Sequence, residues 1–465
     1  MKVKNYCSLR VGSIFKIEPD ISRLRKSVFA AIFLFMALLP LFIPTVLNAD
    51  EKQPAKLLTL EDALEIALEK NKDILKAQEY RRQIEGRYIE ERAAALPQLL
   101  ISSGIYRSRD ESQKAYGPGF PLERKVRSGD IGLSQVLFTF GQVGAAIRGA
   151  RIGIASAEEQ LRIFRQATLR DVSAAFYDVL LAGELQALAR QNLEQRGRHR
   201  DEVQKKFKLG TATDYDVLAA EVAVENARPE VTRMENLVRT SREKLRFLLG
   251  LGDTEVDVRG SLESSIAPYP SWEEAVASAR LRRPDVADMG HRIKIAGELI
   301  TIAKAGDKPR LDLKADWGWS DLAMENGQAD GQVWTAGIFL TYPIFDGWRS
   351  QGKVVQARSN LATLKLEEAK LMDAILLQTR EAVDAVREAG EIAKALAATV
   401  GQADRLLLMA EKGYEFGVKT KLDVDDAALN RMQSRGNLAR ARRDYLMALV
   451  TLDWVRGAIG EGDKR

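Results

Sequence analysis

The chain repeats itself once, and each copy contains a very long stretch without proline. Five landmarks recur in the same order at an offset near 210 residues: Leu58–Ala63 with Pro270–Ala275, Asp73 with Asp285, Ala95–Pro97 with Asp307–Pro309, Phe138–Gly141 with Ile344–Gly347, and Phe207–Gly210 with Tyr414–Gly417. This offset is too long for a solenoid repeat and fits two fused structural halves. The chain is therefore expected to fold as two similar units in tandem.

The long stretches, 141–209 and 347–416, have the composition of helices that pack side by side. Stripes of Ala and Leu are flanked by Glu, Lys, Arg and Gln, a pattern typical of coiled-coil-like packing. At about 1.5 Å per residue, each stretch would make a helix roughly 100 Å long. Because such a helix exceeds the diameter of an ordinary globular domain, the sequence predicts elongated helical hairpins.

Each copy is predicted to contain a medium helix, two strands and a long hairpin. Residues 50–257 form the first copy, with a helix at 59–96, strands at about 97–107 and 128–138, and a hairpin at 141–250. Residues 258–465 form the second copy, with a helix at about 271–305, strands at about 309–319 and 332–345, and a hairpin at 347–458. Pro229 is expected to kink the second arm of the first hairpin.

Residues 1–49 show the order of features found in a cleaved secretory signal. Scattered basic residues precede an apolar run over 28–47, and Ala49 offers a small residue for cleavage. The alternative, an N-terminal membrane anchor, is disfavoured because Pro40 and Pro44 interrupt the run. The segment also carries the whole formal charge of +5, so the mature protein is near neutral and no nucleic-acid partner is expected.

The residue types that carry most enzyme chemistry are missing or isolated. The one cysteine, Cys7, lies inside the signal segment, which leaves the mature chain without a thiol. His199 and His291 have no second ligand at metal spacing and are expected to be surface residues on helices. The glycines of 141–144 precede a helix but lack the Lys-Ser/Thr of a nucleotide site. The chain is therefore predicted to be no enzyme and to need no cofactor or metal.

After the signal segment no stretch reaches the 18 or so apolar residues of a spanning helix, so a membrane span would have to be a closed β-barrel. In 311–319 and 334–342, apolar residues that include three Trp alternate with residues that are polar or glycine, except for Phe339. The first-copy counterparts, 99–107 and 130–138, alternate less cleanly. Strands of about ten residues with one apolar face fit a transmembrane barrel, and a soluble hairpin over a core is the alternative.

Four strands are too few to close a barrel, because single-chain barrels begin at about eight. Three copies would provide roughly 12 strands, together with a helical bundle of matching symmetry. Polar loops at 108–128 and 320–331 would then face the outer surface. The predicted fold class is mainly α, a duplicated helical-hairpin barrel continued by a membrane β-barrel that three protomers share.

This ordered, duplicated pattern resembles the TolC-like outer-membrane efflux protein family. The resemblance covers the chain from Leu58 to about Gly460, and six segments carry it: LTLEDALEIALEKN, ALPQLLISSGIY, VLFTFGQVGAAIRGARIGIASAEEQ, FKLGTATDYDVLAAEVAVENA, YPIFDGWRSQGKVVQARSNL and GYEFGVKTKLDVDDAALNRMQSRGNLARARRDYLMAL. It implies a homotrimer in the outer membrane of a Gram-negative bacterium, continued by a helical tunnel across the periplasm. A periplasmic adaptor and an inner-membrane pump of the RND, ABC or MFS type would complete the exporter, with the lipid of the outer membrane as a further partner.

The tips of the two predicted hairpins share one turn motif. Gly210 and Gly417 end the long helices, as glycine does where φ must turn positive. Thr213 and Thr420 follow, each three residues before an aspartate, which is the spacing of a capping box with Asp in the acid position. By the resemblance, these tip turns would also contact the adaptor.

Asp216 and Asp423 have a simple explanation as the acids of these capping boxes. Asp426 does not, because its counterpart in the first copy is Ala219. Asp423 and Asp426 share a helix face, and threefold symmetry would focus their carboxylates on one axis, raising some pKa values and favouring cation binding. The resemblance implies that they form the periplasmic constriction of the pore. Asp425 points about 100° away from Asp426 and is interpreted as a solvated charge.

The resemblance further implies that Tyr414 and Lys419 hold the tip closed, with Asp216 of the neighbouring hairpin as their partner. Lys419 stands where the best-known members have arginine. Because lysine lacks the bidentate fork of arginine, the latch would be weak, and a solvated lysine is the alternative.

A second class of protein shares many of these features. A periplasmic coiled-coil adaptor or scaffold would have the long hairpins but would lack barrel strands and would span no membrane. Within the channel interpretation the exported substrate stays open among drugs, metals and proteins, because the pump selects it. The sequence shows no His- or Met-rich lining that would indicate metal.

Overall fold

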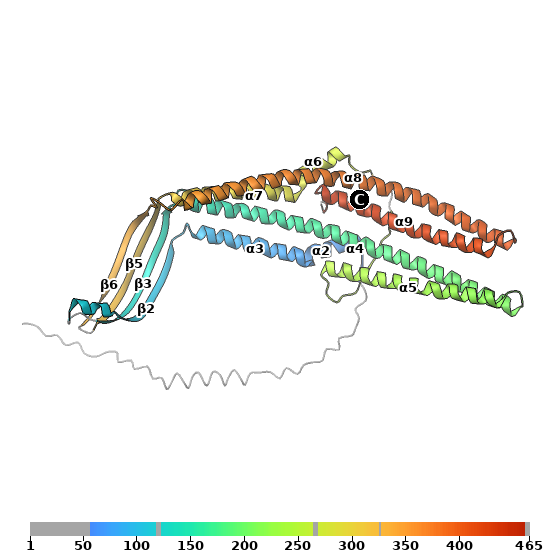
Figure 1. The fold of residues 1–465 in the computed structure, drawn as a ribbon, viewed down its shortest axis with the longest axis horizontal. Coiled ribbons are helices and arrows are strands. Elements are labelled where there is room, and N and C mark those ends of the chain that lie inside the picture. Colours follow the sequence, from blue (N-terminus) through green and yellow to red (C-terminus); the bar gives the residue numbers. More distant parts are fainter. Residues whose placement is uncertain (1–55, 118–121, 264–267, 325–326, 461–465) are drawn as a thin grey trace, which may run out of the picture. The chain divides into compact units, whose positions relative to one another are not determined.

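The computed structural model describes residues 56–117, 122–263, 268–324 and 327–460. The predicted signal segment, 1–49, lies outside these residues. The described chain forms two long helical hairpins, a four-stranded sheet and a two-stranded sheet (Figure 1). The expectation of a mainly helical chain with a small sheet is confirmed.

The first copy runs through five helices and four strands: β1 (Lys56–Leu58), α2 (Leu60–Lys70), α3 (Lys72–Ala93), β2 (Gln98–Arg109), the 3-10 helix η1 (Glu111–Tyr116), β3 (Glu123–Phe138), α4 (Gln142–Lys208), α5 (Asp214–Leu249) and β4 (Val256–Val258). The second copy repeats this order with small changes: α6 (Trp272–Arg282), α7 (Pro284–Lys304), the 3-10 helix η2 (Ala305–Asp307), β5 (Arg310–Met324), β6 (Gly327–Thr341), α8 (Arg349–Glu415) and α9 (Lys421–Val455). The long helices α4 and α8 each contain 67 residues. Pro229 lies inside α5, which remains one helix through it.

The helix predicted over 59–96 is two helices, because the backbone at Asn71 is extended (φ −62°, ψ 128°). The Asn71 side chain accepts hydrogen bonds from the amides of Asp73 and Ile74 at 2.8 and 3.3 Å and so caps α3. Its own amide group donates to the carbonyl of Leu248 at 2.7 Å. One side chain therefore starts a helix and fixes it to α5.

The second copy breaks at the equivalent place, so the single helix predicted over 271–305 is α6 and α7. Arg283 is extended (φ −66°, ψ 124°), and Pro284 occupies the first position of α7. The residue before a proline disfavours the α conformation, and proline fits the first turn of a helix. A local rule therefore explains this break.

Two glycines bring the ends of the short helices against the hairpins. Gly250 has φ +67°, and a Cβ there would lie 2.4 Å from the carbonyl oxygen of Lys70. Gly457, its counterpart, has φ +72°, and a Cβ there would lie 2.8 Å from the carbonyl carbon of Arg282. Any larger residue would combine backbone strain with a steric clash.

Helix α4 is the central element, since it contacts α2, α3, α5, α7 and α9. Its largest core is built with β1 and α5, where Leu58, Val172, Leu245 and Leu249 are fully buried. One window of α4, with a mean hydropathy of 1.2, is apolar enough to cross a membrane by composition alone. Core packing explains part of this apolar character, since 39% of the window is buried.

The four-stranded sheet has the antiparallel order β2-β3-β5-β6, so strands from the two copies meet at β3 and β5. The register aligns rows of residues across all four strands. One row is Ile101, Ile131, Trp317 and Trp334, and the next row on the same face is Leu99, Leu133, Ala315 and Ala336. This face, named the apolar face, gathers the apolar residues of both copies.

The opposite face, named the polar face, carries mostly small and polar residues, with some apolar ones such as Leu100, Val333 and Phe339. Its rows include Ser102, Asp130, Gly318 and Val333, and Gln98, Ser134, Lys314 and Gly337. The first-copy strands alternate less cleanly in sequence, yet their register with β5 places Ile101 and Ile131 beside Trp317. The pairing with β5 therefore shows which face of β2 and β3 is apolar, which the sequence of either strand alone leaves uncertain.

The strands are longer at the loop end than predicted, and β6 ends earlier. β3 begins at Glu123, β5 continues to Met324, and β6 spans Gly327–Thr341 where 332–345 was predicted. Most of the segments predicted as polar loops, 108–128 and 320–331, are therefore strand or 3-10 helix. The antiparallel ladder depends on backbone pairing, so it continues where apolar alternation stops.

Candidate functional site

The two hairpin tips have the same turn geometry. Gly210 and Gly417 both have φ +73°, as the sequence motif predicts. The amide of Thr211 donates to the carbonyl of Lys206 at 2.9 Å, and the amide of Val418 donates to that of Gly413 at 2.7 Å. These bonds close the ends of α4 and α8 in the manner of a Schellman turn.

A complete capping box starts the returning helix of each tip. The Asp216 carboxylate accepts hydrogen bonds from the amide and hydroxyl of Thr213, both at 2.8 Å. The Asp423 carboxylate accepts from the amide and hydroxyl of Thr420 at 2.8 and 2.7 Å. Donation by the Thr213 amide and hydroxyl lowers the pKa of Asp216, and donation chiefly by the Thr420 hydroxyl lowers the pKa of Asp423.

The acids of the second tip have separate surroundings. Lys419 Nζ lies 3.4 Å from the Asp423 carboxylate, and Lys421 Nζ lies 3.0 Å from that of Asp425. Asp426 is exposed, and the described chain gives it neither a hydrogen bond nor an ion pair. Asp426 is thus the acid that the fold of one protomer does not use, while Asp423 serves as a cap.

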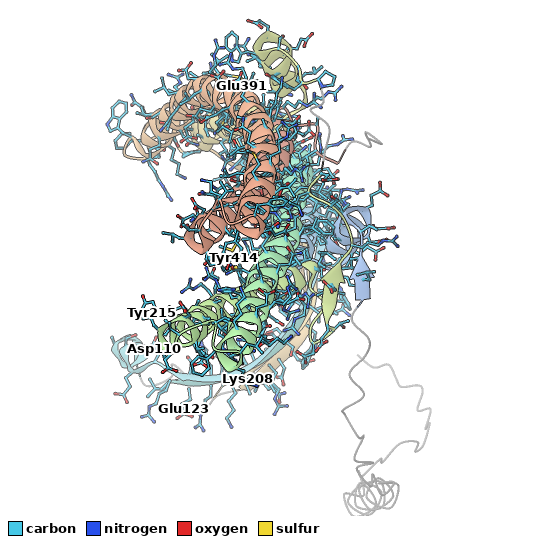
Figure 2. The ribbon with its side chains drawn as sticks, turned by 90° about the vertical axis from the view of Figure 1, so that its right-hand side faces the viewer. Asp110, Glu123, Lys208, Tyr215, Glu391 and Tyr414 are labelled. Atoms are coloured by element: carbon cyan, nitrogen blue, oxygen red, sulfur yellow. The ribbon has the colours of Figure 1, made fainter. Side chains whose placement is uncertain are left out.

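The predicted latch residues are only partly brought together within the chain. Among the described residues, Lys419 pairs with Asp423 and Asp216 accepts from Thr213, so these two do not meet. Tyr414 instead makes a cation–π contact with Lys206 of the other hairpin. The Nζ atom of Lys206 lies 5.9 Å from the centroid of the Tyr414 ring. Figure 2 shows Tyr414 where the second hairpin approaches the first. Sequence reasoning missed Lys206, because a lysine in the last turn of a helix has a sufficient local explanation in the helix dipole.

Large apolar side chains are exposed around both tips. In the first tip Leu209 and Tyr215 are exposed, and in the second tip Phe416, Val418 and Leu422 are exposed. In a single chain these residues form no core. Such apolar patches mark surfaces that another protein covers.

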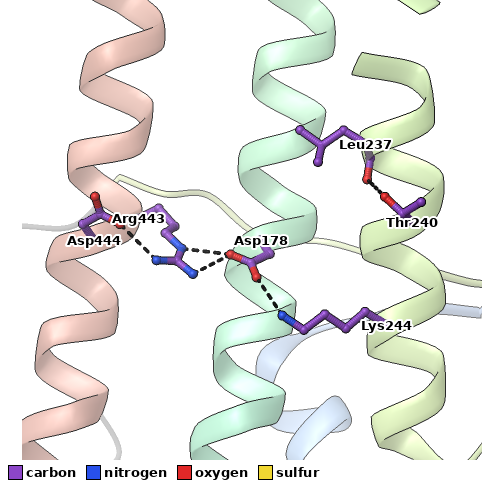
Figure 3. Close-up of polar contacts among 6 residues, drawn as sticks. All are labelled: Asp178, Leu237, Thr240, Lys244, Arg443 and Asp444. Atoms are coloured by element: carbon purple, nitrogen blue, oxygen red, sulfur yellow. Dashed lines mark hydrogen bonds and ion pairs between the residues drawn. The ribbon is translucent and has the colours of Figure 1, made fainter. Parts of the chain in front are cut away.

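Farther from the tips, one aspartate joins the two hairpins (Figure 3). Asp178 of α4 accepts hydrogen bonds from Nε and Nη2 of Arg443 on α9 at 2.9 and 2.6 Å. The same carboxylate lies 3.4 Å from Lys244 Nζ on α5. Burial works against the charge of Arg443, but Asp444 and Asp178 raise its pKa. This link connects three helices from both copies of the repeat.

The histidines differ from the surface residues predicted. His199 is half-buried, and its pKa is lowered by burial and by nearby Lys421, with Asp425 acting in the opposite direction. It therefore lies where α4 faces α9, and His291 on α7 is also partly buried. Within the described residues no group of His, Cys, Asp and Glu has the arrangement of a metal site.

The outer membrane efflux protein model matches residues 63–251 and 275–458, once in each copy of the repeat. The chain belongs to the outer membrane efflux protein family. Members of this family are channels that work with an adaptor and an inner-membrane pump in tripartite systems. The protein is therefore an outer-membrane efflux channel, as the resemblance predicted, and the interpretation as a periplasmic scaffold is not supported.

Individual relatives of the efflux channel are distant but match over most of their length. The outer membrane protein OprJ of Pseudomonas aeruginosa is 29% identical, over 73% of this chain and 71% of its own length. The outer membrane protein TolC of Vibrio cholerae is 22% identical, over 80% of this chain and 84% of its own. The crystal structure of the CmeC outer membrane channel of Campylobacter jejuni has a TM-score of 0.75 at 16% identity, covering 86% of this chain and 85% of that one. That likeness shows the shared fold.

Proposed function

We propose that three copies of this chain form a passive exit duct, in which a 12-stranded β-barrel crosses the outer membrane and the helical hairpins continue the channel across the periplasm. The sheet carries this proposal, because its two faces differ in polarity and its edge strands, β2 and β6, each pair on one side only among the described residues. An open sheet cannot face lipid, since unpaired backbone groups cost several kcal/mol each there. Pairing β6 of one chain with β2 of the next removes every edge.

The barrel would place the apolar face toward lipid and the polar face toward the lumen. The two faces alternate with a period of two, as in known transmembrane barrels. The helix junctions carry exposed aromatic residues, among them Phe140, Tyr342, Phe345 and Trp348. Together with the Trp residues of β5 and β6, they supply aromatic belts near both ends of the apolar band.

Disulfide trapping of the strand edges would test this arrangement. Ser102→Cys on β2 is combined in turn with Val333→Cys, Thr335→Cys and Gly337→Cys on β6. Within one chain these positions are separated by three strand spacings, about 14 Å, which exceeds the reach of a disulfide. Oxidised membranes should therefore yield covalent trimers for at least one pair.

A matched control places the second cysteine at Asp316 on β5, an inner strand that no second chain can reach. This control should leave monomers on a denaturing gel. The proposal fails if every β2–β6 pair also leaves only monomers while the protein fractionates with the outer membrane.

At the periplasmic end we propose that Asp423 and Asp426 form a constriction on the threefold axis. The carboxylate of Asp426 supports this role, because no hydrogen bond or ion pair among the described residues uses it. The predicted rise in pKa requires three chains around one axis and stays a prediction. In one chain, capping instead lowers the pKa of Asp423.

We also propose that tip contacts hold the duct closed. Tyr414 and Lys419 remain candidates, with Asp216 as a partner from a neighbouring hairpin, and the contact with Lys206 adds a further member. The turns at Gly210 and Thr213, and at Gly417 and Thr420, present the exposed apolar residues of the tips. A periplasmic adaptor would cover this surface, and an inner-membrane pump of the RND, ABC or MFS type would supply the energy.

A further inference from the structure

Four basic side chains lie on the apolar face of the sheet at its loop end. One of them, Arg109, is paired with Glu111 and Glu123 at 3.3 and 3.4 Å, which leaves three to consider. Arg107 of β2 is paired in register with Lys125 of β3, and Arg127 lies in the adjacent row of the same face. By strand alternation, all three point to the side that also carries Ile101. We name Arg107, Lys125 and Arg127 the basic cluster.

The basic cluster is incompletely neutralised within the chain. Arg107 Nε donates to Glu123 at 2.9 Å, and its side chain stays 61% exposed. Lys125 and Arg127 are exposed, and the described part of the chain offers neither of them an ion pair or a hydrogen bond. Like charges directly opposite each other destabilise a strand pair, so the Arg107–Lys125 pair favours a bound anion.

The cluster lies just beyond the apolar band. Its nearest row, that of Arg127, is two residues along the strands from the row of Trp319, or about 7 Å. Trp residues of membrane proteins concentrate at the level of the lipid headgroups. Two acids continue this row on β5 and β6. Asp321, directly opposite Arg127, is buried and accepts from Gln328 at 2.9 Å, and Asp330 is exposed. The side of the sheet formed by β2 and β3 is therefore basic at headgroup height.

We propose that Arg107, Lys125 and Arg127 bind the phosphate of a membrane-lipid headgroup at the outer surface of the outer membrane. This inference rests on the proposed orientation of the sheet, with its apolar face toward lipid. The acyl chains would lie along the apolar band, while the phosphate would contact the cations above it. Arginine matches phosphate with two parallel N–H donors, and basic residues near an anionic surface add to the attraction.

Native mass spectrometry of the purified channel, titrated with lipid A bearing two phosphates, would test the site. The double variant Lys125→Gln/Arg127→Gln should weaken lipid A binding about tenfold or more. Arg124→Gln is the matched control, since Arg124 lies on the same strand but on the polar face, where its Nε donates to Ser108 at 3.3 Å. This control should stay within about twofold of the unchanged protein.

Two results would overturn the inference. One is equal loss of lipid A binding in the double variant and in Arg124→Gln. The other is equal binding, by the unchanged protein, of lipid A and of the same lipid without phosphates. Conductance of each variant in planar bilayers separates this question from the proposed duct. Normal conductance with no preference for phosphate rejects the lipid site alone. No conductance from the unchanged protein rejects the duct.

Discussion

At the scale of single residues, the same amino acid serves different purposes at different places in the fold. Asp423 and its first-copy counterpart Asp216 are held by threonine donors, whereas Asp426 has no such partner. Likewise Gly210 turns a solvent-exposed tip, while Gly250 is enclosed by the end of α2. The surroundings of each residue therefore determine its role. Substitutions can distinguish a capping aspartate from an unpaired one, and an exposed glycine from an enclosed one.

Asp426→Asn should weaken block of the channel by divalent cations added on the periplasmic side by about tenfold, because three carboxylates leave the axis. The measurement is single-channel current against cation concentration. Asp425→Asn is the control, since Asp425 is on the same turn but paired with Lys421, and it should leave the block unchanged. Equal effects of the two substitutions would contradict a constriction at Asp426.

Gly250→Ala should reduce the amount of assembled channel severely, whereas Gly210→Ala should be tolerated. Both substitutions place a Cβ at positive φ, which costs roughly 1–2 kcal/mol. Only Gly250 adds a clash with backbone, the carbonyl oxygen of Lys70, while nothing lies within 4 Å of a Cβ at Gly210. Trimer yield from outer membranes is the readout, and similar yields would refute the argument.

At the scale of elements, most of the returning and short helices begin with a side-chain cap, and polar links then join the hairpins. Four capping boxes start α2, α5, α6 and α9. Between the hairpins, Asp178 connects α4 with α5 and α9. Local signals thus set where helices begin, and tertiary links set which helices stay together.

Acid should loosen the tips only at low pH. The lowered pKa values of Asp216 and Asp423 mean that their stabilisation is complete above the unfolded value of about 3.9 and is lost as pH falls through the folded value. Hydrogen exchange of the tip peptides, corrected for intrinsic rates, should therefore be constant from neutral pH down to the unfolded value and rise as the pH falls below it. Thr420→Val should move this onset to higher pH in the second tip alone, and a shift in both tips would contradict the assignment.

Asp178→Ala should lower the temperature at which the channel dissociates. The Asp178 and Arg443 side chains are only 25% and 26% exposed, so removal leaves a charge without its partner at a cost of about 1–3 kcal/mol. Glu235→Ala is the control, because Glu235 and Arg190 form a similar pair that is 46% and 59% exposed. Exposed pairs contribute about 0–1 kcal/mol, so equal shifts would show that Asp178 forms no special link.

At the scale of the whole molecule, the two faces of one sheet separate lipid from lumen in the proposed trimer. Ala336 lies on the apolar face and Thr335, its neighbour in sequence, lies on the polar face. Most side chains of the edge strand β6 are exposed on both faces, whereas Asp321 on the apolar face and Val126 on the polar face are buried. The apolar face would meet lipid, and the polar face would meet lumenal water, only in the assembled channel.

Ala336→Lys should block assembly in the membrane, whereas Thr335→Lys should allow it. A lysine facing the middle of the bilayer costs about 2–4 kcal/mol, while a lumenal lysine remains in water. The amount of heat-resistant trimer in outer membranes is the measurement. Tolerance of both substitutions would mean that the apolar face does not contact lipid.

Much of this fold follows from short-range sequence patterns. The duplication, the two long helices, the positive φ of Gly210 and Gly417 and both tip capping boxes could be predicted, because each depends on residues within a few positions of one another. The break between α6 and α7 at Arg283 is also indicated in the sequence by the Arg-Pro pair. The helical periodicity on both sides of this pair nevertheless favours one continuous helix. Family membership followed from the order of these local signals.

Other features were decided only when distant segments met. The Lys206–Tyr414 contact and the Asp178–Arg443 pair join residues more than 200 positions apart, so no spacing rule could predict them. The faces of β2 and β3 became clear only through their register with β5, and the extra strand residues at the loop end through backbone pairing. The free energy of forming a helix or a cap comes mostly from residues near one another in sequence. The pairing of strands and of distant side chains depends instead on which segments the rest of the fold brings together.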